Sequence, residues 1–70
     1  MPCSRHCHNW QILIEAEFKN DEGVYFQVVE IEKRATFEKL HDDIESAVEV
    51  IFEKENMKNY INTHITAVIK

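Results

Sequence analysis

The sequence predicts a single small α+β domain in which two strands, one long helix and a last strand follow in that order (ββαβ). Apolar and polar residues alternate before residue 20 and again after residue 60, as they do along half-buried strands. Between these segments, apolar residues recur at spacings of three and four, the period of an amphipathic helix. We therefore expect residues 9–70 to form a three-stranded, mainly antiparallel sheet with the helix packed on one face, preceded by a flexible polar tail at residues 1–8.

The first two strands are expected to form a hairpin. The first begins at Asn9 and ends at Asn20-Asp21-Glu22-Gly23, where a four-residue turn with a bulge is expected because Gly23 can take a positive φ. If Lys19 then faces Val24, opposed residues share a face along the second strand, Val24 to Lys33. The predicted core face combines Trp10, Ile12, Ile14, Ala16 and Phe18 with Tyr25, Val29 and Ile31.

The other face of the hairpin is expected to stay open, because one helix covers only one face of a sheet. Soluble monomers seldom expose a contiguous apolar patch, so we expect this face, or a sheet edge, to make a homodimer or a contact with another protein. The predicted interface residues are Leu13, Phe26, Val28, Glu15, Glu17 and Glu30, with Glu32, Val24 and Val68 beside them.

The helix is expected over residues 37–56, with Thr36 as its N-cap. A competing interpretation gives residues 35–40 to a short strand and begins a shorter helix at Asp42. The last strand is expected from Ile61 to Ile69, which is rich in β-branched residues. The apolar stripe of the helix consists of Phe37, Leu40, Ile44, Ala47, Val48 and Ile51, with Phe52 at its margin.

The helix carries the net charge of the chain. Residues 36–56 hold seven acidic residues and two lysines, a difference of −5, which equals the formal net charge of the whole chain. At about 100° per residue, five of these carboxylates fall in one row opposite the apolar stripe: Glu38, Asp42, Glu45, Glu49 and Glu53. We call these five residues the carboxylate row. Like charges four residues apart destabilise a helix, so the row predicts a contact with a basic surface on a partner protein; the alternative is a solvated helix face.

A cluster of soft ligands lies near the N-terminus: Cys3, His6, Cys7 and His8. Two cysteines four residues apart are expected to be reduced thiols or metal ligands. A zinc-binding protein is therefore the alternative function, with half a site completed by His41, His64 or a second subunit. The competing interpretation is a tail with incidental cysteines and histidines, and no other cofactor is expected.

Several function classes are disfavoured by the same sequence. An acidic chain with few clustered lysines and arginines does not suit direct nucleic-acid binding. No apolar run approaches the ~20 residues of a membrane span, and no signal peptide is expected, so we predict a cytoplasmic protein. Neither Ser4, Ser46 nor Cys7 has a base at a recognisable spacing, so no enzyme is expected.

The layout of hairpin, helix and final strand in an acidic chain resembles small proteins that bacteriophages and mobile elements make to inhibit host enzymes. The segment Asp43-Ile44-Glu45-Ser46-Ala47, which follows a hairpin, also resembles the partner-binding half of HicB-type antitoxins. The chain departs from that half in lacking its glycine-containing third-strand segment. Both resemblances imply stoichiometric binding to a partner protein, as an inhibitor or regulator.

Overall fold

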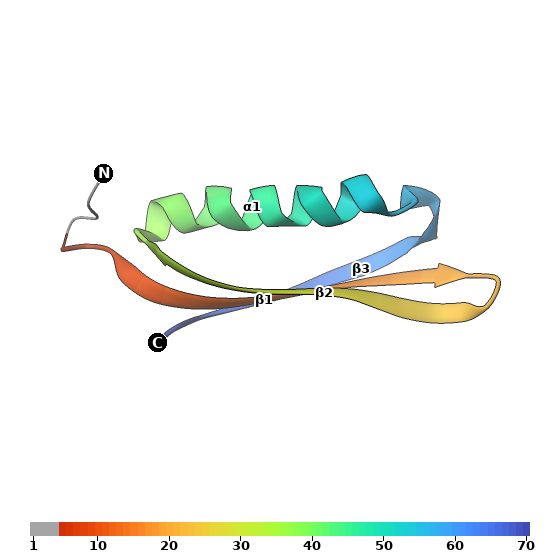
Figure 1. Cartoon of the computed structure of the whole chain (residues 1–70), viewed down its shortest axis with the longest axis horizontal. Coiled ribbons are helices and arrows are strands. Elements are labelled where there is room, and N and C mark those ends of the chain that lie inside the picture. The colour runs from red at the N-terminus through yellow and green to blue at the C-terminus, as the bar shows by residue number, and fades with distance from the viewer. Residues whose placement is uncertain (1–4) are drawn as a thin grey trace.

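The computed structural model describes residues 5–70 and confirms the ββαβ architecture. One face of the three-stranded sheet is covered by a single helix (Figure 1), and every strand pair is antiparallel, in the order β2-β1-β3. The elements are β1 (His8–Asn20), β2 (Gly23–Ala35), α1 (Phe37–Lys54), the 3₁₀ helix η1 (Met57–Asn59) and β3 (Tyr60–Ile69). No helix in the part described is both long and apolar enough to cross a bilayer.

The β1–β2 hairpin has the predicted register. Phe18 pairs with Tyr25, and Lys19 pairs with Val24. The turn leaves two residues unpaired between Asn20 and Gly23: the Asn20 Oδ1 atom accepts a 2.8 Å hydrogen bond from the Glu22 amide, and Gly23 has φ +126°. This ladder runs without a register shift; the shift in the sheet lies between β1 and β3, at Glu17/Phe18. β1 begins at His8, one residue before the predicted start.

The core lies between the sheet and α1, on the predicted face. Ile12, Ile14 and Phe18 of the central strand are completely buried. Phe18 stacks on Tyr25, with ring centroids 5.5 Å apart, and the indole Nε1–H of Trp10 donates a 3.0 Å hydrogen bond to the Ala35 carbonyl. That buried bond closes the open end of the hairpin, where the chain leaves β2 for the helix.

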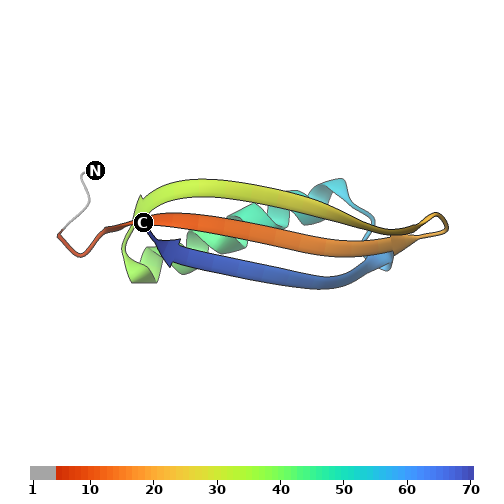
Figure 2. The ribbon, with the colours of Figure 1, turned by 90° about the horizontal axis from the view of Figure 1, so that it is seen from below.

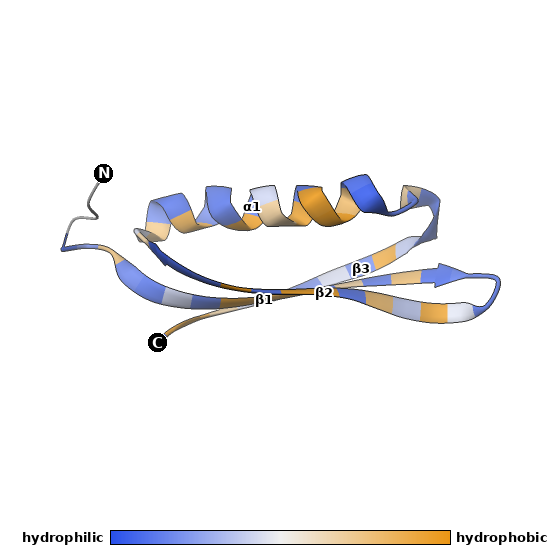
Figure 3. Ribbon diagram, in the orientation of Figure 1, coloured by the Kyte–Doolittle hydropathy of each residue, from blue (hydrophilic) through white to orange (hydrophobic). Residues whose placement is uncertain are grey.

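The helix begins where its N-cap predicts. The Thr36 Oγ1 atom accepts a 3.2 Å hydrogen bond from the Lys39 amide, and Thr36 itself is extended, so the competing short strand at residues 35–40 is wrong. The helix ends at Lys54, two residues before the predicted end, because Glu55 is extended and Asn56 caps η1 instead. Figure 3 shows the apolar stripe of α1 toward the sheet and its polar residues on the outer side.

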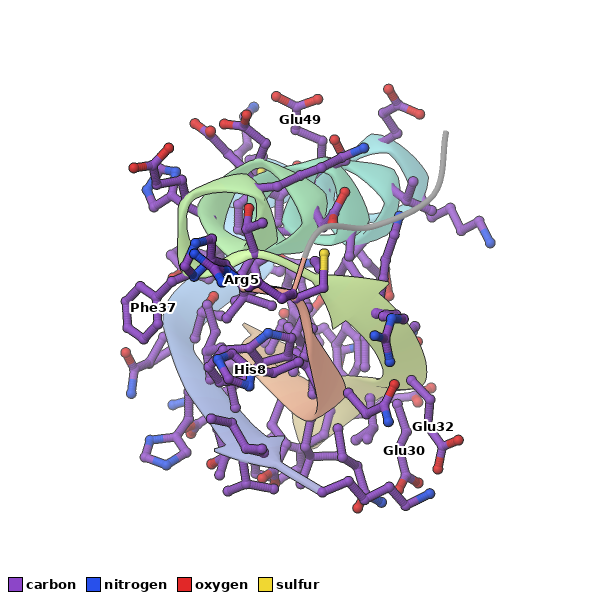
Figure 4. The ribbon with its side chains drawn as sticks, turned by 90° about the vertical axis from the view of Figure 1, so that its left-hand side faces the viewer. Arg5, His8, Glu30, Glu32, Phe37 and Glu49 are labelled. Atoms are coloured by element: carbon purple, nitrogen blue, oxygen red, sulfur yellow. The ribbon has the colours of Figure 1, made fainter. Side chains whose placement is uncertain are left out.

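The helix crosses the sheet obliquely. Its N-terminal end lies toward β3 and its C-terminal end toward β2 (Figure 2), and its closest packing is against β2 and β1. The first residue of the apolar stripe, Phe37, was expected in the core but is 74% exposed. Its ring lies on the β3 side of the molecule (Figure 4) and contacts Trp10 edge-on, with 5.6 Å between ring centroids.

Candidate functional site

The carboxylate row lies on the outer side of α1, as predicted. All five residues are exposed, and Glu49 points directly away from the sheet (Figure 4). The helix that carries them is held to the sheet by the buried side chains of Leu40 and Ile51. The row is therefore a linear array of negative charges on an anchored element.

No lysine or arginine of residues 5–70 forms an ion pair with the row. Among the described residues, its charge contacts are with His41, whose Nδ1 atom lies 3.9 Å from Asp42 Oδ1 and 3.8 Å from Glu45 Oε2. All three side chains are well exposed, so these contacts contribute little to stability. The carboxylates of the row are therefore available to contact solvent or a partner.

The other two acidic residues of this segment have partners on β2. Asp43, whose side chain is 12% exposed, lies 3.1 Å from the Lys33 ammonium group. Glu55, just after the helix, accepts a 2.7 Å hydrogen bond from the Gln27 side chain. The structure thus separates the acids that attach the helix to β2 from the five that face outward.

The open face of the sheet brings the predicted interface residues together. Val24, Phe26 and Val28 alternate along β2 on this face and are each more than half exposed. Leu13 on β1 is partly buried beside them, and Val68 on β3 is 49% exposed. The acids of this face are Glu15 and Glu17 on β1 and Glu30 and Glu32 on β2.

Two of these four glutamates are bound within the chain. Glu30 accepts a 3.0 Å hydrogen bond from the Gln11 side chain, and Glu32 pairs with the Lys70 ammonium group. Glu30 and Glu32 lie together on the β2 side of the face (Figure 4). His64 on β3 lies opposite Glu15 and is on the same face. The face therefore has an apolar strip on the edge strand β2, with Glu15 and Glu17 beside it on the central strand and Glu30 and Glu32 farther along β2.

The N-terminal cysteine–histidine cluster is described only from residue 5 onward, so Cys3 lies outside the described residues. Cys7 is buried and disulfide-bonded, which corrects the prediction of a reduced thiol or a thiolate ligand. His6 and His8 line an open hollow of ≈ 410 Å³ with Thr36, Phe37 and Glu38. Zinc binding by the other predicted ligands of this cluster stays a prediction.

A different group of potential metal ligands appears on the helix. Within residues 5–70, His41, Asp42 and Glu45 are the three residues whose ligand atoms come within 4.8 Å of one another. All three are exposed and belong to the carboxylate row or border it. We assign them no metal, because exposed acidic groups gather in this way on many acidic helices.

Sequence reasoning missed a third surface, on the side of the molecule formed by β3 and α1. An apolar groove there is lined by Ile44 and Val48 of the helix and by Ile65 of β3, with His41 and Glu45 at its margin. Ile65 pairs with the fully buried Ile14 of β1, yet it is 42% exposed. The oblique path of α1 leaves it uncovered, and that angle is set by tertiary packing that no local pattern in the sequence records.

Comparison with known protein families, with curated proteins and with solved structures gave no match for this chain.

Proposed function

We propose that this protein is a small acidic interaction module that binds a basic surface on a partner protein stoichiometrically and so inhibits or regulates it. The observation that supports this most is the carboxylate row: five exposed acids in line on a packed helix, with no lysine or arginine pairing to them within residues 5–70. Three pairs in the row are like charges four residues apart, a spacing that costs about 0.2–0.5 kcal/mol each. Folding gains nothing from them.

The row has the dimensions of a segment of nucleic-acid backbone. Glu38 and Glu53 are separated by 15 residues of helix, or about 22 Å, so one carboxylate falls on every ~5.5 Å. A single DNA strand carries one phosphate per about 3.4 Å of axis, a charge density of the same order. We propose that the row occupies a nucleic-acid-binding groove of the partner protein, whose lysines and arginines would otherwise bind phosphates.

The open face of the sheet completes the proposed contact. Its apolar strip of Val24, Phe26 and Val28 offers the desolvated contact area that a carboxylate row by itself lacks. The homodimer expected from the sequence, through this face or through a sheet edge, is also part of the proposal. A cytoplasmic location is also proposed. Because cytosolic thiols are kept reduced, it predicts that Cys7, which is disulfide-bonded in the structure, is reduced in the cell.

The proposal is tested by affinity capture with the immobilised protein from a lysate of the cells that carry its gene. Captured proteins are identified at low and high salt, and the bound partner is then challenged with duplex DNA. A partner that binds through the row is released by salt, because exposed charges are screened within about 10 Å at 0.1 M ionic strength. The same partner is released by DNA, because both ligands occupy one groove.

Two double variants with equal charge changes locate the contact. Asp42→Lys with Glu49→Lys reverses two members of the row, whereas Asp21→Lys with Glu22→Lys reverses two exposed acids at the tip of the hairpin. The proposal predicts that the first loses the partner and the second keeps it. Equal capture by wild type and the helix variant would show that the row is a solvated surface.

A further inference from the structure

The side of the molecule formed by β3 and α1 exposes residues that belong to the core face. Ile14 and Ile65 are cross-strand neighbours on the same face of the sheet, yet Ile14 is fully buried and Ile65 is 42% exposed. Ile69 is 56% exposed, and Phe37 of the helix is 74% exposed on the same side (Figure 4). Ile65 lines an apolar groove with Ile44 and Val48 of the helix, bordered by His41 and Glu45, and we call this side of the molecule the β3 flank.

Within residues 5–70, no strand pairs with the outer edge of β3 along this flank. β3 is an edge strand, because the sheet order is β2-β1-β3. The Lys70 amide donates a 2.8 Å hydrogen bond to the Asn9 carbonyl, and hydrogen-bonded and non-hydrogen-bonded pairs alternate along an antiparallel ladder. The odd-numbered residues of β3 therefore direct their amides and carbonyls away from β1, to the free edge: Thr63, Ile65, Ala67 and Ile69.

The two edges of the sheet differ in charge. β2 carries Glu30, Glu32, Lys33 and Arg34, the kind of residues that keep an edge strand from pairing with another chain. From Tyr60 to Ile69, β3 has no aspartate, glutamate, lysine or arginine and no proline. In a chain with a net charge of −5, this is the element on which two copies can approach without opposing carboxylates.

We propose that two copies of this chain pair through β3, antiparallel across a two-fold axis, so that the sheets join into one of six strands. The free amides and carbonyls of Ile65 and its neighbours then pair with those of the second copy, and both helices lie on the same side of the joined sheet. The β3 flank of each copy covers that of the other. A strand that carries no aspartate, glutamate, lysine or arginine and is identical in both partners suits a self-complementary contact better than a contact with a charged protein.

The size of the flank fits such a contact. Ten strand residues at about 3.3 Å each span ~33 Å, and the molecule is 20 Å deep from helix to sheet. Their product, about 660 Å², is close to the ~800 Å² per partner of a standard interface. Of the carboxylate row, Glu45 borders the groove of this flank, whereas Glu49 stays on the outer side of the helix, away from the proposed interface.

The test is the oligomeric state of the full chain, measured by analytical ultracentrifugation up to the concentration of an NMR sample. Ile65→Lys places a charge in each half of the proposed interface and is expected to weaken the dimer by at least about 100-fold in Kd. Val28→Lys is the matched control: it adds the same charge at an exposed residue of the open face. Circular dichroism of both variants establishes that they are folded.

We expect a wild-type dimer, a monomeric Ile65→Lys variant and a dimeric Val28→Lys variant. We also expect slow hydrogen exchange at the amides of Ile65 and Ala67 in the wild type, because only a second copy gives them acceptors. A monomeric wild-type chain would overturn the proposal, and so would a dimer that survives Ile65→Lys. A dimer that Val28→Lys dissociates would place the interface on the open face instead, and rapid exchange at both amides in a dimer would exclude pairing through β3.

Discussion

Reversing one charge in the centre of the carboxylate row is predicted to stabilise the protein. Glu49 has like-charged neighbours one turn away on both sides, Glu45 and Glu53. Glu49→Lys removes two repulsive pairs and creates two attractive ones, each worth about 0.2–0.5 kcal/mol, so we expect a gain of roughly 0.8–2 kcal/mol. That is a large part of the ~3.5–10 kcal/mol that a domain of this size has in total.

The assay is urea unfolding at low salt and one fixed protein concentration, followed by circular dichroism. Glu49→Gln removes only the repulsion, so it should give about half the gain, roughly 0.4–1 kcal/mol. Glu22→Lys, at the exposed turn of the hairpin, should change stability by no more than about 0.5 kcal/mol. All gains should shrink at 1 M salt, where charges are screened within ~3 Å.

The reasoning fails if Glu49→Lys is no more stable than wild type at low salt. In that case the row would cost the fold nothing, and its arrangement would no longer indicate selection for a contact. If Glu49→Lys is more stable but no longer captures the partner, then Glu49 lowers the stability of the fold and supports binding, as expected of a residue on a functional surface.

Three further predictions concern the elements that position these surfaces, each measured by urea unfolding. Thr36→Ala should cost about 1 kcal/mol through loss of the N-cap bond to the Lys39 amide, and Thr36→Ser should restore most of it; equal stability of both would contradict the capping role. Gly23→Ala should cost about 1–3 kcal/mol, because φ +126° strains the backbone of any residue with a side chain. The added Cβ meets no other described residue within 4 Å, so a steric clash does not contribute to this cost. A neutral result there would mean that the turn can rearrange. Ile14→Val should cost about 0.5–1.5 kcal/mol as a cavity in the core, whereas Val28→Ala on the open face should stay within about 0.5 kcal/mol; equal costs would show that the open face is covered.

The hairpin and the carboxylate row could be predicted because short-range chemistry determines both. The turn at Asn20–Gly23 sets which residues oppose each other, and alternation then assigns every side chain to a face, so Phe18 and Tyr25 had to meet. Helical periodicity placed Glu49 opposite the apolar stripe in the same way. The Thr36 cap fixed the start of the helix, because a side-chain acceptor is needed there by amides that have no partner within the helix.

What could not be predicted depends on how elements meet in space. The angle of α1 over the sheet follows from the packing of Leu40 and Ile51, and this angle decides that Phe37 and Ile65 stay exposed. The predicted end of the helix was two residues too late, because Glu55 is extended and accepts a hydrogen bond from Gln27 on β2. This contact joins residues that are far apart in the sequence. The state of Cys7 depends on the geometry around its sulfur atom, which spacing along the chain does not determine.

The most direct test of the proposed function is the salt dependence of the Kd between this protein and its captured partner. Wild type should show a steep loss of affinity as salt rises, and the variant with Asp42→Lys and Glu49→Lys should bind weakly at every salt concentration, with a shallower slope. The same affinity and slope for both proteins would contradict the proposal that the carboxylate row is the binding surface.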